Sequence, residues 1–125
     1  MGTAIRAEIS SKNKYWINKH RHYELKHFCL QYPDWKKAYS DLRDAIAPAF
    51  ISKRVAMRTI YLKNIELIEK TAKEADPYLY EYIIKGVTEG KSYTYMKTVL
   101  GIPCGKDMYY DRYRKFFWLL SKSRE

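Results

Sequence analysis

The sequence predicts an all-α fold, in which an N-terminal helical hairpin and a long helix precede a C-terminal three-helix helix-turn-helix unit. Apolar residues recur at spacings of three and four along nearly the whole chain, which is the period of an amphipathic helix. Only five glycines and four prolines occur among 125 residues, which disfavours a turn-rich β protein. The length and the apolar content of 46% are typical of one domain, or of one domain with a small appendage.

The first predicted helix is rich in lysine and histidine and follows a loose arm over residues 1–10. Ser10 or Ser11 supplies its N-cap, and it runs to about Gln31. Its inward stripe is expected at alternating spacings of four and three: Trp16, His20, Tyr23, His27 and Leu30.

A second helix is predicted to start at Pro33-Asp34, because proline ends the first helix and favours the first turn of the next. Its inward residues are expected to be Trp35, Ala38, Tyr39, Leu42 and Ile46. The tripeptide at 47–49, Ala-Pro-Ala, then predicts a loop.

The third predicted helix is the longest and runs from an N-cap at Ser52 to about Ala75. Most of its apolar residues share one face: Val55, Leu62, Ile65, Ile68 and Ala72. Ile60 and Leu67 fall outside that face, so we expect the helix to be covered on more than one side or to pair with a partner. Residues 1–75 are therefore predicted to form a helical buttress or dimerisation region.

The C-terminal unit, residues 76–125, is predicted from local start and stop signals. Asp76-Pro77 combines an N-cap acid with a first-turn proline, and Gly90 ends the helix that they open. Ser92 caps a short helix over 93–100, which Gly101 closes. The inward residues of these two helices are expected to be Leu79, Tyr82, Ile83, Val87, Met96, Val99 and Leu100.

A turn with Gly101 and Gly105, and a last helix over about 106–121, complete the predicted helix-turn-helix. Gly101 is expected to supply the left-handed backbone of a sharp turn, and Ile102 to point back between the helices. Lys97 stands where such units usually carry a small residue, so Met96 takes the inward role. The inward stripe of the last helix is expected to be Tyr109, Tyr113, Phe116 and Leu120.

The charge of the chain predicts a polyanionic partner. Lysine and arginine number 24 against 14 aspartates and glutamates, which gives a net charge of +10 and a pI of about 9.5. The last helix of a helix-turn-helix lies in the major groove of DNA, with its N-terminal half toward the bases. A helical wheel gives the candidate DNA-binding residues: Lys106, Tyr110, Asp111, Arg112, Arg114 and Lys115.

Two further surface features are predicted around this helix. Phe117 and Trp118 are expected on or near its outer face, covered by the N-terminal helices. A secondary basic surface is predicted in the first helical region: Lys12, Lys14, Lys19 and Arg21.

Part of the chain resembles known transcription proteins. Residues 93–102, followed by a basic helix, resemble domain 4 of bacterial sigma factors. The sequence IPCGKDMYYDRYRKFFWLL over 102–120 resembles the C-terminus of phage and prophage late-transcription regulators of the ArpU/RinA type, and SKNKYWI (11–17) and FCLQYPDW (28–35) are similar to the start of small prophage proteins in that group. The resemblance implies a small DNA-binding activator of phage structural and lysis genes, which is not an enzyme.

No enzyme, metal or cofactor site is predicted. The sequence has neither a Walker A motif nor GxGxxG, and its three histidines have no nucleophile at a suitable spacing. His20 and His22 point apart on a helix and no second ligand pair accompanies them, so zinc is not expected. Cys29 and Cys104 form no CxxC motif and are expected to be free and buried.

The sequence shows neither an apolar run of about 20 residues nor a signal peptide, so an intracellular protein is expected. The resemblance to phage regulators implies that its location is the cytoplasm of a bacterial host. Double-stranded DNA is the predicted partner, with RNA polymerase and a second copy of the chain as further candidates. Two other functions stay open: a DNA-packaging protein similar to a small terminase subunit, and an RNA polymerase adaptor. The target sequence, the sign of regulation and the oligomeric state are left open as well.

Overall fold

The all-α prediction is confirmed in the computed structural model, which describes residues 11–43 and 51–125. These residues contain helices and no strands. The helices are α1 (Lys19–Leu30), α2 (Tyr32–Arg43), α3 (Ile51–Ala75), α4 (Tyr80–Glu89), α5 (Tyr93–Thr98) and α6 (Lys106–Ser123). The predicted arm over 1–10, the loop at 47–49 and the side chains of Leu42, Ile46 and Ser52 lie outside the described part.

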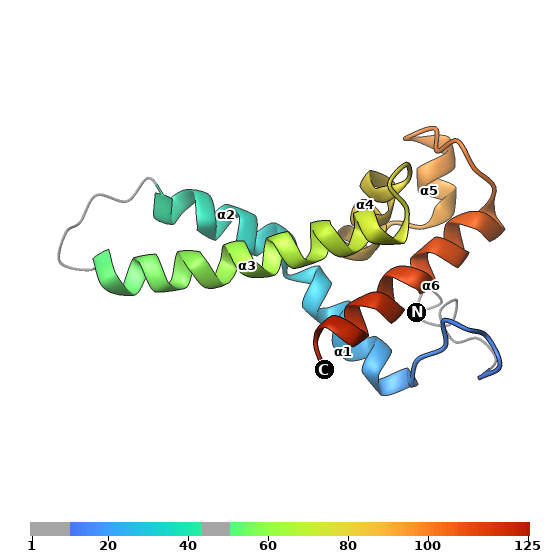
Figure 1. The fold of residues 1–125 in the computed structure, drawn as a ribbon. Coiled ribbons are helices and arrows are strands. Elements are labelled where there is room, and N and C mark those ends of the chain that lie inside the picture. The colour runs from blue at the N-terminus through green and yellow to red at the C-terminus, as the bar shows by residue number, and fades with distance from the viewer. Residues whose placement is uncertain (1–10, 44–50) are drawn as a thin grey trace.

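A long hairpin of α2 and α3 extends away from a body that contains α1, α4, α5, α6 and the C-terminal part of α3 (Figure 1). The helical hairpin therefore lies one helix later than predicted, because only Gln31 separates α1 from α2. The N–H of Trp35 donates to the carbonyl of Gln31 at 3.0 Å, so the chain bends there without reversing.

One hydrophobic core joins the regions 1–75 and 76–125. Leu25 of α1 and Ile68 of α3 belong to the same buried cluster as Phe116 of α6. Helix α1 packs on α4 and α6, and α3 packs on α2, α4 and α6. The N-terminal region thus supplies part of the core in which α6 is embedded.

The start and the inward face of α1 differ from the prediction. The helix begins at Lys19, because the side chain of Asn18 accepts the N–H of His20 at 2.9 Å and so supplies the N-cap. Its buried residues are His22, Leu25, Phe28 and Cys29. The expected inward positions Trp16, His20, His27 and Leu30 are exposed instead. Two stripes compete in this segment, and the one with Leu25 and Phe28 is buried because it places fewer polar rings in the core.

The start and stop signals of α4 and α5 act as predicted. The Asp76 carboxylate accepts the N–H groups of Tyr78 and Leu79 at 2.8 and 3.0 Å, and regular helix follows from Tyr80. Gly90 ends α4 with φ of 68°, and Ser92 caps α5 through the N–H of Tyr95 at 3.3 Å. Val99, which was expected inward, is 60% exposed because α5 ends at Thr98, before it.

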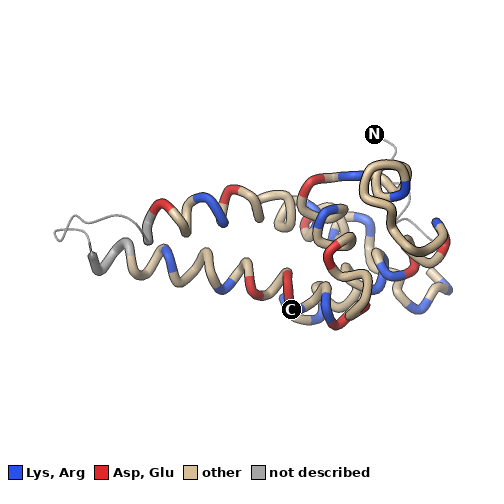
Figure 2. The backbone as a smooth tube through the Cα atoms, turned by 90° about the horizontal axis from the view of Figure 1, so that it is seen from above, with Lys and Arg blue, Asp and Glu red and all other residues tan. Residues whose placement is uncertain are grey.

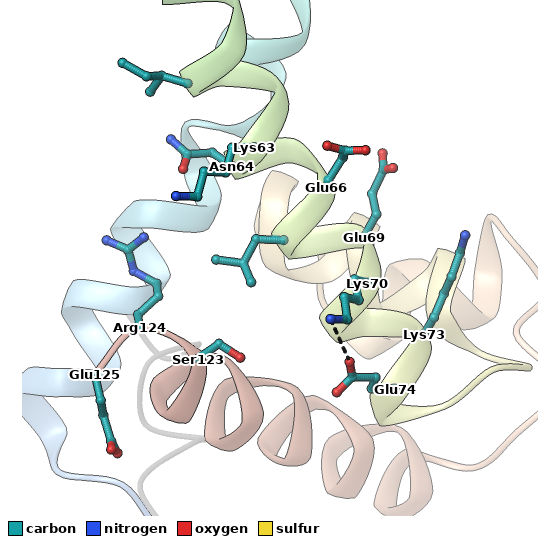
Figure 3. Close-up of a pocket in the computed structure, with 12 residues that line it drawn as sticks. Lys63, Asn64, Glu66, Glu69, Lys70, Lys73, Glu74, Ser123, Arg124 and Glu125 are labelled. Carbon is teal, nitrogen blue, oxygen red and sulfur yellow. Dashed lines mark ion pairs between the residues drawn. The ribbon is translucent and has the colours of Figure 1, made fainter.

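The outer face of α3 remains open although the helix is covered on more than one side. Ile60 is 56% exposed and Leu67 is half-buried. Both line a groove that runs along α3 from Ile60 to Glu74 and ends at Ser123 of α6 and at Arg124 and Glu125, which follow that helix (Figure 3). We call this feature the α3 groove. Basic and acidic positions are interspersed along this stretch of α3 (Figure 2).

Candidate nucleic-acid interface

A sharp turn between α5 and α6 brings the two helices together as the sequence predicts. Gly101 has φ of 65°, in the left-handed region that favours glycine. Ile102 is buried after it, and its N–H donates to the carbonyl of Met96 at 3.0 Å. Gly105 precedes α6 with an ordinary extended backbone, so only Gly101 of these two glycines needs its conformational freedom.

Tyr93, which the sequence analysis did not single out, holds α5 and the turn against α6. Its hydroxyl donates to the carbonyl of Cys104 at 2.6 Å, and its ring lies 5.9 Å from that of Tyr109. Its backbone N–H donates to the hydroxyl of Tyr110 at 3.3 Å. Short helices such as α5 are marginal alone, so these contacts determine its position.

Helices α4 and α6 approach closely at Gly86. A Cβ added to Gly86 would lie 2.0 Å from the hydroxyl oxygen of Tyr109, a distance that no side chain can occupy. That hydroxyl is buried and has no hydrogen-bond partner among the described residues, and its burial raises the pKa of Tyr109. The signal in the sequence was a glycine within an amphipathic helix, which often marks close packing.

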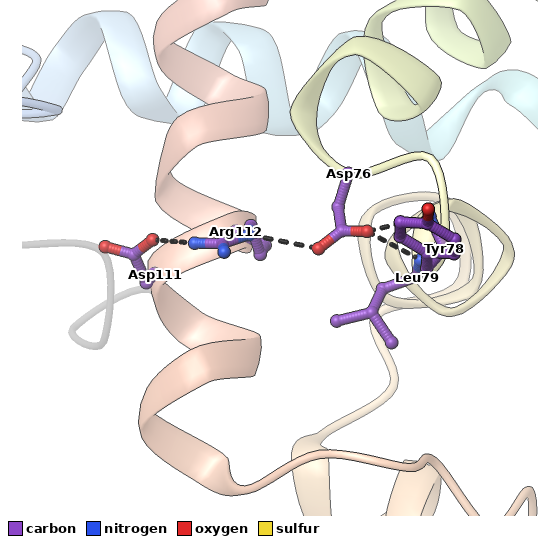
Figure 4. Close-up of polar contacts among 5 residues, drawn as sticks. All are labelled: Asp76, Tyr78, Leu79, Asp111 and Arg112. Carbon is purple, nitrogen blue, oxygen red and sulfur yellow. Dashed lines mark hydrogen bonds and ion pairs between the residues drawn. The ribbon is translucent and has the colours of Figure 1, made fainter.

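Arg112 joins α6 to the turn between α3 and α4 (Figure 4). Its Nε donates to Oδ2 of Asp76 at 3.0 Å, and its Nη1 pairs with the carboxylate of Asp111. Burial would raise the pKa of Asp76, but the N–H groups of Tyr78 and Leu79 and the Arg112 guanidinium together lower it below its ordinary value. Arg112 is therefore a structural link, and Asp111 is neutralised by it.

The other DNA-binding candidates are distributed unevenly around α6. Tyr110 is only 8% exposed and faces the core, so its placement on the outer flank was wrong. Its hydroxyl accepts the N–H of Tyr93, which the wheel could not show. Lys106 is exposed at the start of the helix, and Arg114 and Lys115 are half-buried on its sides.

Helices α4, α5 and α6 thus pack into a compact unit through these contacts. No family model, curated protein or solved structure matches the chain. Within the described ranges, no helix is both long and apolar enough to cross a membrane. The same residues bring no three His, Cys, Asp or Glu side chains together as metal ligands.

The C-terminal half of α6 is packed by the N-terminal region. Phe117 is only 1% exposed and lies 4.8 Å from the ring of His22 in α1, so its predicted cover by an N-terminal helix is confirmed. Trp118 is half-buried, with the ring of Tyr15 at 5.5 Å and Nζ of Lys122 at 3.7 Å. The predicted cover of Trp118 thus comes from the segment before α1 and not from a helix.

The secondary basic surface divides into one structural residue and three exposed lysines. Arg21 donates through Nε to the hydroxyl of Ser121 at 3.1 Å and through Nη2 to its carbonyl at 2.9 Å, so it fastens α1 to α6. The exposed members are Lys12, Lys14 and Lys19. Nζ of Lys14 lies 5.0 Å from the Tyr15 ring centre, and Tyr15 in turn lies against α6, which places this lysine beside the outer face of that helix.

Both cysteines are free, as expected, but only Cys29 is buried, whereas Cys104 is half-exposed in the turn before α6. Burial raises the pKa of each thiol, so neither is an activated nucleophile.

Proposed function

We propose that this protein binds double-stranded DNA through α5 and α6 and inserts the N-terminal half of α6 into the major groove. The observation that carries the proposal is the α5–α6 turn at Gly101, which packs Tyr109 and Tyr113 inward and leaves the first residues of α6, Lys106, Asp107 and Met108, exposed. This arrangement is typical of a helix-turn-helix, whose second helix enters the groove with its N-terminal residues foremost.

The packing of α6 supports its N-terminal half as the contact region. Arg21 and Tyr15 contact the C-terminal half at Ser121 and Trp118. Around the first half, the turn is exposed at Pro103, Gly105 and Lys106. A major groove about 12 Å wide admits one helix, so the half of α6 that neither Tyr15 nor Arg21 contacts, among the described residues, is the one that fits.

Charge supports the same surface. Lys106, Arg114 and Lys115 supply positive charge on α6, and the pairing of Asp111 with Arg112 reduces its repulsion of phosphate. Lys14 adds charge beside the same helix. With a net charge of +10, the chain is attracted to DNA over long range at low salt.

The resemblance of residues 102–120 to ArpU/RinA-type regulators suggests what the binding serves. We infer that the protein regulates transcription of phage or prophage genes in the bacterial cytoplasm, with RNA polymerase as a further partner. A protein can bind DNA without regulating transcription, and a DNA titration measures only the binding.

The test is a fluorescence-anisotropy titration of a labelled duplex, selected from random sequence by the protein itself, at several salt concentrations. If four to six phosphates are neutralised, log K is expected to fall with log salt with a slope of about −4 to −5. Lys115→Ala is expected to reduce that slope by about one unit, as the loss of one phosphate contact does. Arg114→Ala is expected to weaken the selected duplex more than a scrambled one if Arg114 contacts a base.

Lys37→Ala is the matched control, because it removes the same charge from an exposed position on α2, away from α6. It is expected to leave both the affinity and the salt slope near those of the wild type. Absence of duplex binding at low salt would overturn the proposal. So would a Lys37→Ala protein that loses as much affinity as Lys115→Ala, because general charge attraction would then explain the binding.

A further inference from the structure

The exposed face of α3 that lines the α3 groove has the residue spacing of a helix that packs against a second helix. Counting along α3, the outward positions recur at intervals of four and three: Ala56, Ile60, Lys63, Leu67, Lys70 and Glu74. This is the spacing of the a and d positions of a heptad repeat. The face is open over a volume of about 1180 Å³, and Ile60 and Leu67 are the apolar side chains that line it.

The charge of the groove differs from that of the whole protein. Four basic and four acidic side chains line it, so its net charge is zero although the chain carries +10 (Figure 3). A polyanion is therefore not its partner, because four carboxylates would repel one. Two copies of the chain repel each other through their net charge of +10, but the groove itself adds no net charge where two such faces come together.

The order of the charges is self-complementary. Along the outward side of α3, Lys63 is followed by Glu66, then Lys70, then Glu74. If a second α3 lies antiparallel across a two-fold axis near residue 68, Lys63 faces Glu74 of the second copy and Lys70 faces its Glu66. Leu67 then lies beside the axis and packs against Leu67 of the second copy, as a closed two-fold interface requires.

These charged groups are available for a partner. Neither Lys63 nor Glu66 forms an ion pair within the described part of the chain, and the Lys70–Glu74 pair is exposed and 4.0 Å long. Such a pair contributes little to folding, so it can be exchanged for a pair with another chain at small cost.

We propose that the α3 groove is a homodimer interface, in which two copies of the chain pack their α3 helices antiparallel. The inference does not rest on DNA binding. If both hold, each dimer presents two α6 helices, and the DNA site consists of two half-sites in inverted orientation.

The test is sedimentation equilibrium without DNA, over about 1 to 100 μM protein, a range that spans the affinities of small interfaces. The wild type is expected to reach twice the mass of one 15.0 kDa chain. Lys63→Glu with Lys70→Glu makes the face acidic, and Glu66→Lys with Glu74→Lys makes it basic. Each double variant is expected to sediment as a monomer, whereas their equimolar mixture is expected to form the dimer.

The matched control reverses two exposed lysines elsewhere, with Lys37→Glu on α2 and Lys97→Glu on α5, and is expected to keep the wild-type dimer. Each variant is expected to fold, because all the substituted side chains of the groove are largely exposed, and circular dichroism verifies it. A monomeric wild type over the whole range would overturn the proposal, and so would a mixture that stays monomeric. Because no DNA is present, either result leaves the DNA-binding proposal to its own titration.

Discussion

Arg112 of α6 donates from Nε to one carboxylate oxygen of Asp76, while the other oxygen of Asp76 accepts the N–H groups of Tyr78 and Leu79. One side chain, 7% exposed, thus caps the turn into α4 and holds α6 against that turn. Removal of the carboxylate leaves the buried N–H of Leu79 and the half-buried Nε of Arg112 without this acceptor, which is more costly than the loss of an exposed ion pair.

We therefore expect Asp76→Ala to lower the free energy of unfolding by about 2–3 kcal/mol, the sum of a lost N-cap and a lost charge-assisted hydrogen bond. Chemical denaturation followed by circular dichroism measures it. Glu89→Ala is the control, because its pair with Lys85 is exposed on α4, and its midpoint is expected to match the wild type. Equal midpoints for both variants would show that Asp76 does not hold the two elements together.

The same carboxylate predicts how stability depends on acidity. The pKa of Asp76 lies below its ordinary value of 3.8 in the folded protein, so the folded state binds the proton less readily than the unfolded state. The stabilisation by Asp76 is then present above pH 3.8 and is lost as the pH falls through the folded pKa.

Asp76→Asn tests this dependence, because an amide oxygen can still accept the N–H groups of Tyr78 and Leu79 while the charge toward Arg112 is absent. The difference in unfolding free energy between wild type and Asp76→Asn is expected to be constant near neutral pH and to shrink in acid. A difference that stays the same down to the acid transition would contradict an ionised Asp76 as its source.

At the contact of α4 with α6, we expect Gly86→Ala to destabilise the protein and Tyr109→Phe to rescue it. The added Cβ would lie 2.0 Å from the Tyr109 hydroxyl oxygen but 3.4 Å from the ring carbon that bears it. In the Tyr109→Phe background the hydroxyl is absent, so the methyl group that Gly86→Ala adds fits after a small shift. Alanine is also favoured over glycine within a helix by about 1 kcal/mol.

Thermal melting of the two single variants and the double variant measures the coupling between these positions. Tyr109→Phe alone is expected to melt at or above the wild-type temperature, because it removes a buried hydroxyl that has no partner in the described residues. Additive effects of the two substitutions would rule out the close approach as the reason for glycine.

At the α5–α6 turn, Gly101→Ala is expected to cost about 1–2 kcal/mol, the penalty of a left-handed backbone for a residue with a Cβ. The cost is conformational, because among the described residues no atom beyond its two chain neighbours lies within 4 Å of the added Cβ. Gly101→Asn is expected to cost less, since asparagine tolerates this conformation. Gly105→Ala serves as the comparison, because that site is equally open and its φ of −80° suits any residue. Equal losses at the two glycines would contradict a role for the positive φ.

The elements that sequence patterns predicted well are those whose limits depend on neighbouring residues. Asp76 and Ser92 accept backbone N–H groups within three residues, and Gly90 and Gly101 act through the positive φ of their own backbone, so these roles can be read from a single chain. The inward face of α6 was also predicted correctly. Its four residues recur at helical spacing and are all buried: Tyr109, Tyr113, Phe116 and Leu120.

The misassigned residues depend on contacts from distant segments. Tyr110 and Arg112 both lie beside the predicted core stripe of α6, and a wheel gives either one an outward flank. The N–H of Tyr93, 17 residues earlier, places Tyr110 inside, and Asp76, 36 residues earlier, holds Arg112. In α1, histidines and aromatic rings on every side gave two stripes of similar strength, and the stripe that is buried packs His22 on Phe117 of α6.

Helix α3 belongs to the hairpin at one end and to the body at the other, over 25 residues without a break. Its buried residues Ile68, Ala72 and Ala75 are covered by α4 and α6, whereas α2 covers its other side. A fragment that ends at residue 75 would expose these side chains. A fragment that starts at residue 76 would lack the side chains that share the buried core with Phe116. Because these residues share one core, we expect the hairpin and the α4–α6 unit to unfold together in a single cooperative transition.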